Sequence, residues 1–346
     1  MLKINMFSTA TKVKGQGVGS AYTELVRLLK ERFSAEFKIE INNYKDSVDI
    51  THYHTINPTF YLSTFSKKRG RKIGYVHFLP ETLEGSLKIP TPFRQIFYKY
   101  IISFYKRMDE IVVVNPTFIP KLEKYGIKKE RITYIPNFVS KAEFHQVNAS
   151  DKVALRSSYG YEQKRFTIVC TGQVQTRKGV LDFIKLAKQN PEFQFIWVGG
   201  FSFGSMTDGY EELKKVVDNP PKNLSFPGIV DRTSLVDYYN LADVFLLPSY
   251  NELFPMSVLE AFSCGIPVVL RNLELYQKII GKYYLPAQNE LEMNEILNNL
   301  ANSPEMIEKY QAKAVEASDY YSEDHLATIW HQFYLDQAQV GKESKG

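Results

Sequence analysis

Short apolar runs alternate with helical periodicities along most of the chain. In the first half, strands are predicted at residues 3–7, 48–52, 72–77, 110–114 and 131–135, and helices at 20–33 and 93–106. In the second half, buried strands are predicted at 166–170, 194–198, 224–226, 244–247 and 267–270, with helices at 179–189, 210–217, 234–241 and 257–263. Strands that alternate with helices favour parallel sheets covered on both faces. Two such series predict an α/β protein with two Rossmann-like, doubly wound domains.

The polar stretch 139–164 follows a strand and a turn, which indicates a domain boundary. We place the N-terminal domain at residues 1–148 and the second domain at 149–320. The segment 321–346 contains a final helix that carries Trp330, Phe333 and Tyr334. Because an apolar end helix needs a surface to cover, we expect this segment to cross back to the N-terminal domain.

Composition excludes several classes of protein. The chain has 346 residues, of which 44% are hydrophobic and 23% charged, so it can bury a large core and is not disordered by composition. No apolar run reaches the ~18–20 residues that a transmembrane helix needs, and the first residues do not resemble a signal peptide. Cys170 and Cys264 form neither a disulfide framework nor a metal-ligand spacing. We therefore expect a reduced, cytoplasmic protein.

Charge is unevenly divided along the chain. Residues 1–150 contain 24 Lys and Arg against 13 Asp and Glu, a net of +11, whereas residues 151–346 contain 19 against 25, a net of −6. A basic first half indicates an anionic partner there, and nucleic acid, an anionic membrane and phosphorylated substrates all fit this charge.

The most informative motif lies at residues 249–262, directly after the predicted strand 244–247. A loop in this position opens at the ligand crevice of a parallel sheet, and the helix that follows presents free N–H groups suited to a diphosphate. Glu252 and Glu260 place one carboxylate in the loop and one in the helix. These carboxylates suit a sugar and a ribose, although a dipole partner and a solvated helix carboxylate would look the same.

The spacing of Glu252 and Glu260 around Phe254, followed by Glu-Ala-Phe-x-Cys-Gly-x-Pro-Val-Val at 260–269, resembles the retaining glycosyltransferases of family four. That family has the GT-B fold, in which two Rossmann-like domains face a cleft. The resemblance implies that Glu252 contacts the donor sugar and that Glu260 contacts the nucleotide ribose. Pro255 has no N–H, so donor contacts at the start of the helix fall to Leu253, Phe254 or Met256.

A second match covers Gly172–Gly179, which resembles the family's Gly-Arg-Leu-x-x-x-Lys-Gly. Lys178 aligns with the family lysine, whose positive charge stabilises the departing diphosphate. Gln173 occupies the arginine position, and we propose that Arg177 supplies the missing cation, with a solvent-facing side chain as the alternative. Residues 226–230 resemble the loop that holds the nucleotide base through backbone groups, which assigns donor binding to Ile229 and Val230. Gly172 belongs to the same donor site by resemblance.

Two features of the first half extend the resemblance. The glycines of residues 15–20, Gly17 among them, correspond to the loop that closes over the donor, and a flexible surface loop is the alternative. His77 corresponds to a histidine near the donor and acceptor sugars, and a structural histidine is the alternative. His52 and His54 are weaker candidates. No Asp-x-Asp pair stands out, so we expect no metal and no other cofactor.

A basic and aromatic segment indicates what the first half binds. Phe93, Ile96, Phe97, Tyr100, Ile101 and Phe104 share one helical face, and a basic cluster precedes them. A helix of this kind can lie in an anionic membrane surface, or its apolar face can pack on the sheet. The net charge favours the membrane, and nucleic acid fits less well because no binding motif accompanies the charge. The predicted membrane-binding residues are Lys67, Lys68, Arg69, Arg71, Lys72, Arg94, Lys99, Lys106 and Arg107.

Taken whole, the chain resembles the bacterial diglycosyl-diacylglycerol synthases of family four. The resemblance implies transfer of a hexose from UDP-glucose or UDP-galactose to monoglucosyl-diacylglycerol, which gives an α-linked glycolipid that also anchors lipoteichoic acid. The implied location is peripheral, at the cytoplasmic face of the membrane. Two alternatives remain, namely a family member that acts on a soluble or wall-polymer acceptor and a catalytically silent protein that binds nucleotide sugars.

Overall fold

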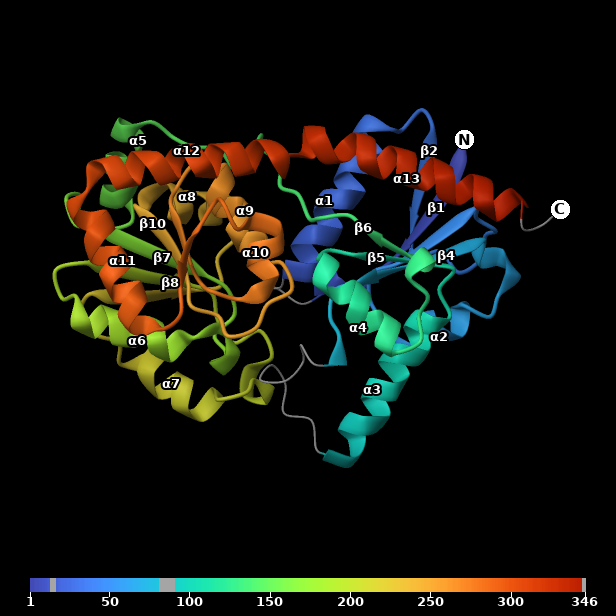
Figure 1. Cartoon of the computed structure of the whole chain (residues 1–346), viewed down its shortest axis with the longest axis horizontal. Helices are drawn as coiled ribbons and strands as arrows, with labels where there is room; N and C mark the ends of the chain where they lie inside the picture. The colour runs from blue at the N-terminus through green and yellow to red at the C-terminus, as the bar shows by residue number, and fades with distance from the viewer. Residues whose placement is uncertain (13–16, 81–90, 344–346) are drawn as a thin grey trace. The chain divides into compact units, whose positions relative to one another are not determined.

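The chain folds into two compact units in a computed structural model that describes residues 1–12, 17–80 and 91–343. The first unit contains the described residues up to Phe138 together with those from Glu323 onward, and the second begins at Val139 and ends at Ser322. Each unit is a sheet with helices around it (Figure 1). The sequence predicted the boundary between the two domains within residues 139–164, and it predicted that the chain returns to the first domain from residue 321 onward.

The first unit is built on a parallel sheet with the strand order β2-β1-β3-β4-β5-β6. Its helices cover this sheet, and its central strands are largely buried on both faces, as in a covered parallel sheet. The strands are β1 Leu2–Phe7, β2 Phe37–Ile41, β3 Ile50–Tyr53, β4 Arg71–Val76, β5 Glu110–Val113 and β6 Ile132–Tyr134. The α-helices are α1 Gly17–Arg32, α2 Pro58–Ser63, α3 Thr91–Lys106, α4 Ile119–Lys124 and α13 Glu323–Glu343.

Helix α13, the last helix of the chain, packs on this first sheet (Figure 1, red). Trp330 and Tyr334 are fully buried, and the Tyr334 hydroxyl lies 2.7 Å from Nδ1 of His52 in β3. Arg27 of α1 forms an ion pair with Glu323 at the start of α13. The aromatic residues of this end segment therefore complete the core of the first unit.

The second unit has a parallel sheet with the order β12-β11-β10-β7-β8-β9. Its strands are β7 Thr167–Thr171, β8 Gln194–Val198, β9 Leu224–Gly228, β10 Val244–Leu247, β11 Val268–Arg271 and β12 Leu285–Ala287. Its α-helices are α5 Ala149–Ser158, α6 Val180–Gln189, α7 Tyr210–Asp218, α8 Arg232–Leu241, α9 Met256–Ser263, α10 Glu274–Ile280, α11 Glu290–Asn302 and α12 Pro304–Tyr320. The prediction of two doubly wound, parallel α/β sheets is confirmed.

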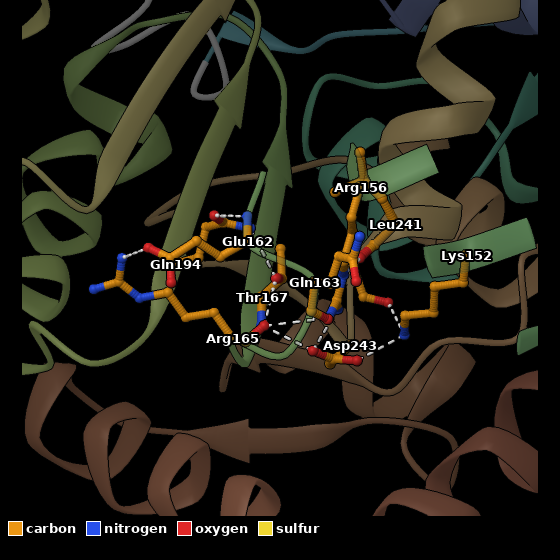
Figure 2. A network of polar contacts seen from close by, with 10 residues as sticks. Lys152, Arg156, Glu162, Gln163, Arg165, Thr167, Gln194, Leu241 and Asp243 are labelled. Carbon is orange, nitrogen blue, oxygen red and sulfur yellow. Dashed lines mark hydrogen bonds and ion pairs between the residues drawn. The ribbon is translucent and has the colours of Figure 1, made fainter. Parts of the chain in front are cut away.

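A polar network around Asp243 ties α5 to the start of β7 and β10 (Figure 2). Its carboxylate accepts hydrogen bonds from Lys152 Nζ at 2.6 Å, from Arg156 Nη2 at 2.7 Å and from the Thr167 N–H at 2.8 Å. Burial alone would raise the pKa of Asp243, but Lys152 and Arg156 outweigh it and hold that pKa below its ordinary value. The Asp243 carboxylate thus balances the positive charges of Lys152 and Arg156.

Replacing Asp243 with asparagine is therefore expected to lower the free energy of unfolding of the second unit by about 3 kcal/mol, because two buried cations lose their counter-ion. Urea unfolding measures this change. The matched control is Asp218→Asn, which removes the exposed pair with Lys214 on α7 and is expected to cost at most about 0.5 kcal/mol. Equal effects of the two substitutions would show that the network does not stabilise the fold.

Candidate functional site

The strand order of the second unit identifies the edge at which a ligand binds. From β7 the chain continues through β8 and β9 on one side, and β10 then pairs with β7 on the other side. In open parallel sheets, ligands bind at the carboxyl ends of the strands where the order reverses in this way. The loops after β7 and β10 therefore meet at the predicted ligand edge, and they contain the two motifs that the sequence singled out.

The loop after β7 brings a lysine over the sheet edge. A single 3-10 turn, Thr176–Lys178, ends at Gly179, which has a φ of +75°. A Cβ at Gly179 would lie 2.3 Å from the Pro248 carbonyl oxygen, so only glycine allows the two loops to approach this closely. A Cβ at Gly172 would lie 3.9 Å from Nζ of Lys178, which places that amine beside the end of β7.

The loop after β10 brings Glu252 to this lysine. Nζ of Lys178 donates to Oε1 of Glu252 at 2.5 Å, and both side chains are buried. Nη1 of Arg177 lies 3.7 Å from Oε2 of Glu252 and donates to the Asn251 carbonyl oxygen at 2.9 Å. Arg177 therefore lies against the Glu252 loop rather than pointing to solvent. Two cations and one carboxylate converge at this point.

The electrostatics of this cluster favour the ionised form of Glu252. Burial alone would raise the pKa of Glu252, but Lys178 and Arg177 outweigh burial and lower it. Burial lowers the pKa of Lys178, with Arg177 acting in the same direction, while Glu252 opposes the shift. A further anion such as a diphosphate would meet positive charge already held in position.

Glu260 lies in α9 and is buried. Its Oε2 accepts a hydrogen bond of 2.6 Å from the Tyr239 hydroxyl, which also lies 2.6 Å from Oγ1 of Thr171. Thr171 ends β7 and Tyr239 comes from α8. The second carboxylate of the motif is thus oriented by a relay from two other elements, which the sequence analysis missed because no local pattern links residues so far apart.

A second missed set of residues supports the Glu252 loop. The Tyr250 hydroxyl donates to Oδ2 of Asp182 at 2.6 Å, and Arg271 pairs with the same carboxylate. The Arg271 guanidinium lies 4.0 Å from the centre of the Tyr250 ring. An aspartate from α6 and an arginine from β11 therefore fix the loop two residues before Glu252.

The remaining predicted donor-binding residues lie around the same edge, with one exception. Ile229 and Val230 follow β9, and a Cβ at Gly200 would lie 3.1 Å from Cγ1 of Ile229. Met256 is the first residue of α9, and Pro255 is its N-cap rather than part of its first turn. The rest of the loop consists of the half-buried Leu253 and the buried Phe254, whose ring centre lies 5.4 Å from that of Tyr321. The exception is Gly17, which is the first residue of α1 in the first unit.

His77 follows β4 in the first unit and is buried beside two other histidines. The ring centres of His54 and His77 are 5.8 Å apart, and those of His52 and His54 are 4.2 Å apart. Burial lowers the pKa of His77 to about 3. The imidazole is therefore neutral at neutral pH and can act through hydrogen bonds but not as a cation. Among the described residues, no group of three or more His, Cys, Asp or Glu has an arrangement that could hold a metal ion.

The predicted membrane-binding cations divide into two groups. Lys67, Lys68, Lys99 and Lys106 are exposed, and Arg94 is half-buried. Arg71 and Lys72 pair with Glu110 and Asp109.

Arg69 is a correction to the sequence analysis. Its side chain is 1% exposed and donates to the carbonyl oxygens of Asn43, Tyr44 and Asp46, so it holds a loop of the first unit and is not available to a membrane. A run of cations suggests solvated side chains, but the backbone carbonyl groups of this loop draw one arginine inward.

An exposed apolar surface accompanies the exposed cations. Four large apolar side chains are each at least 60% exposed: Leu62 on α2, Phe65 just after α2, and Phe93 and Ile96 on α3. The two helices are neighbours, because the Tyr61 hydroxyl of α2 lies 2.9 Å from Oγ of Ser103 in α3. We call these four residues the apolar face. No helix among the described residues is long and apolar enough to span a bilayer.

Comparisons with known proteins agree with this geometry. Residues 151–317 match the family described as Glycosyl transferases group 1, and residues 15–143 match Glycosyltransferase Family 4. The chain is 52% identical over 343 residues to the alpha-galactosylglucosyldiacylglycerol synthase of Streptococcus pneumoniae, covering 99% of this chain and 91% of the relative. It is 26% identical to the processive diacylglycerol alpha-glucosyltransferase of Acholeplasma laidlawii, covering 89% and 91%.

A solved structure shares the fold. Anabaena HepE in complex with UDP-glucose superposes with a TM-score of 0.77 at 15% identity, covering 97% of this chain and 100% of that one. At this identity the likeness concerns the fold alone, and it identifies the two-sheet architecture as GT-B.

Proposed function

Because this chain belongs to the family-four glycosyltransferases, we propose that it transfers a hexose from a UDP-hexose to monoglucosyl-diacylglycerol and forms an α-linked diglycosyl-diacylglycerol. The observation that carries the proposal is the buried Lys178–Glu252 pair at the switch point of the second sheet. The name of the streptococcal relative supports the acceptor, and it favours UDP-galactose over UDP-glucose as the donor.

The chemistry follows from the charges of the second unit. Transfer breaks the bond between hexose C1 and the diphosphate, and the acceptor hydroxyl oxygen bonds to C1 on the face that the diphosphate leaves. The hydroxyl proton passes to the departing diphosphate. Lys178 and Arg177 stabilise the negative charge that grows there, and Glu252 orients the hexose through its hydroxyl groups.

Three further groups have proposed roles in binding the substrates. Glu260, oriented by Tyr239, accepts hydrogen bonds from the ribose hydroxyls. Ile229 and Val230 hold the uracil through their backbone groups. The neutral His77 of the first unit hydrogen-bonds a sugar hydroxyl.

The donor and the acceptor are tested together. The purified chain is incubated with monoglucosyl-diacylglycerol in vesicles and with UDP-galactose or UDP-glucose in separate reactions, and the lipids are analysed by mass spectrometry. We expect one added hexose and the higher rate with UDP-galactose. Efficient transfer to a water-soluble glucoside with none to the glycolipid would favour the soluble-acceptor alternative, and tight UDP-hexose binding without turnover would favour the silent binding protein.

The peripheral membrane location gives a further prediction. Replacing Lys67 and Lys68 together by glutamine is expected to weaken binding to anionic vesicles roughly 30-fold, because each lysine near an anionic surface contributes about 1 kcal/mol. Vesicle flotation measures binding. The control replaces Lys214 and Lys215 of α7, outside the apolar face, and is expected to change little. A wild-type chain that does not float with anionic vesicles would contradict the membrane location.

A further inference from the structure

A cavity of about 400 Å³ opens in the first unit. Residues 55–58 between β3 and α2, Phe78 after β4, and Phe97 and Tyr100 on α3 line it. It therefore lies at the carboxyl ends of β3 and β4, on the edge of a parallel sheet where ligands bind. Its volume falls within the range of small-molecule sites.

The wall of this cavity is apolar because its polar groups are bonded to one another. Oδ1 of Asn57 accepts from the Thr55 hydroxyl at 2.8 Å and from the Thr9 hydroxyl at 2.9 Å. The Tyr100 hydroxyl donates to the Ile56 carbonyl oxygen. These groups already hydrogen-bond within the protein, so they offer little to a sugar or a phosphate. A hydrocarbon chain needs no hydrogen bonds from the wall.

Helix α3 connects this cavity to the apolar face. Phe93, Phe97, Tyr100 and Phe104 lie on one side of the helix at spacings of three or four residues. Phe93 is 63% exposed, Phe97 and Tyr100 line the cavity, and Phe104 is buried. A continuous apolar track thus runs from the surface into the cavity.

Exposed basic side chains accompany the elements that form this track. Lys99 and Lys106 on α3 and Lys67 and Lys68 after α2 are exposed. This charge complements an anionic bilayer, which brings lipid to the mouth of the cavity.

We propose that the cavity binds one acyl chain of the glycolipid acceptor, drawn from the membrane while the sugar headgroup remains at the carboxyl edge of the sheet. This inference rests on the proposed function for the identity of the lipid. Phe78 of the cavity wall directly follows His77 in the chain, so the same strand end carries both the proposed acyl contact and the proposed sugar contact.

Photocrosslinking tests the cavity without requiring turnover. A monoglucosyl-diacylglycerol with a diazirine at the end of one acyl chain is incorporated into phosphatidylglycerol vesicles with the full chain and no donor. Peptide mapping is expected to find adducts at residues 55–58 and 97–100. Adducts confined to 62–65 and 93–96 would mean that the acyl chains remain in the bilayer, and would overturn the proposal.

A chain-length series gives an independent readout. Short-chain glucosyl-diacylglycerols, used below their aggregation concentration, are expected to show a KM that falls about fourfold per buried methylene. Phe97→Gln places an amide in the half-buried cavity wall and is expected to flatten this dependence, while Ile41→Gln on the exposed end of β2 retains it.

The two proposals fail in different ways. Transfer with the same chain-length dependence in Phe97→Gln and wild type would overturn the acyl site and leave the proposed function intact. Absence of transfer to every acceptor would overturn the proposed function, and the crosslinking result would still decide whether the cavity holds an acyl chain.

Discussion

Replacing Lys178 with alanine is expected to lower kcat for hexose transfer by about 10²–10³-fold, while the protein remains folded. The proposed reason is that its ammonium, held 2.5 Å from Glu252, stabilises the negative charge of the departing diphosphate. Initial rates at saturating UDP-hexose measure the effect, and circular dichroism verifies the fold. Glu252→Ala is expected to lower kcat by a similar factor, because the hexose would no longer be oriented and Lys178 would lose its buried counter-ion.

The matched control for these variants is Lys185→Ala. Lys185 lies on α6, seven residues after Lys178, and its exposed side chain pairs with Glu290. We expect this variant to retain wild-type kcat. Near-normal transfer by folded Lys178→Ala would remove the lysine from the mechanism, and near-normal transfer by folded Glu252→Ala would do the same for the carboxylate.

Acid is expected to unfold the first unit through its three buried histidines. Burial lowers the pKa of His52 and His77 to about 3 and that of His54 well below its ordinary value, so all three are neutral in the folded protein at neutral pH. Unfolded histidines titrate near pH 6.5, so below that pH the unfolded chain binds more protons than the folded chain. Stability is therefore complete above about pH 6.5 and is lost as the pH falls toward about 3.

The expected slope is about 1.4 kcal/mol per pH unit for each histidine, or roughly 4 kcal/mol per unit for the cluster, well below pH 6.5. Amide hydrogen exchange in β3 and β4, corrected for its intrinsic pH dependence, measures this slope. His54→Gln should remove about one third of it, whereas His145→Gln at an exposed position should leave it unchanged. Equal protection of these strands at pH 5 and pH 7 would contradict the buried, neutral state of the cluster.

The central strands of both sheets and one edge strand of each could be predicted from the sequence, whereas the other edge strand of each sheet could not. Residues 194–198 and 244–247 are strands with the predicted bounds, because buried parallel strands are continuous apolar runs. In the first sheet the missed edge strand is β2, in which the apolar residues Phe37, Ile39 and Ile41 alternate with charged residues. In the second sheet the missed edge strand is β12, which has only three residues and contains Pro286, a residue that is tolerated at an edge but weakens the pattern.

Sequence motifs identified the charged centre of the candidate site but not the residues that support it. Lys178 and Glu252 carry local signatures in the loops after their strands, and the structure brings them into contact. Tyr239 beside Glu260 and Arg271 beside Asp182 have no such signature, because they meet only through the pairing of distant elements. Arg69 was misjudged for the same reason, since its backbone partners lie in a different loop.

The configuration of the new glycosidic bond tests the central claim most directly. Glycolipid formed from monoglucosyl-diacylglycerol and UDP-galactose is purified, and the coupling constant of its new anomeric proton is measured by NMR, while released UDP is quantified. The account predicts one α-linked hexose on the glucosyl headgroup for each UDP released. A β-linked product, or release of free hexose without a new glycolipid, would contradict it.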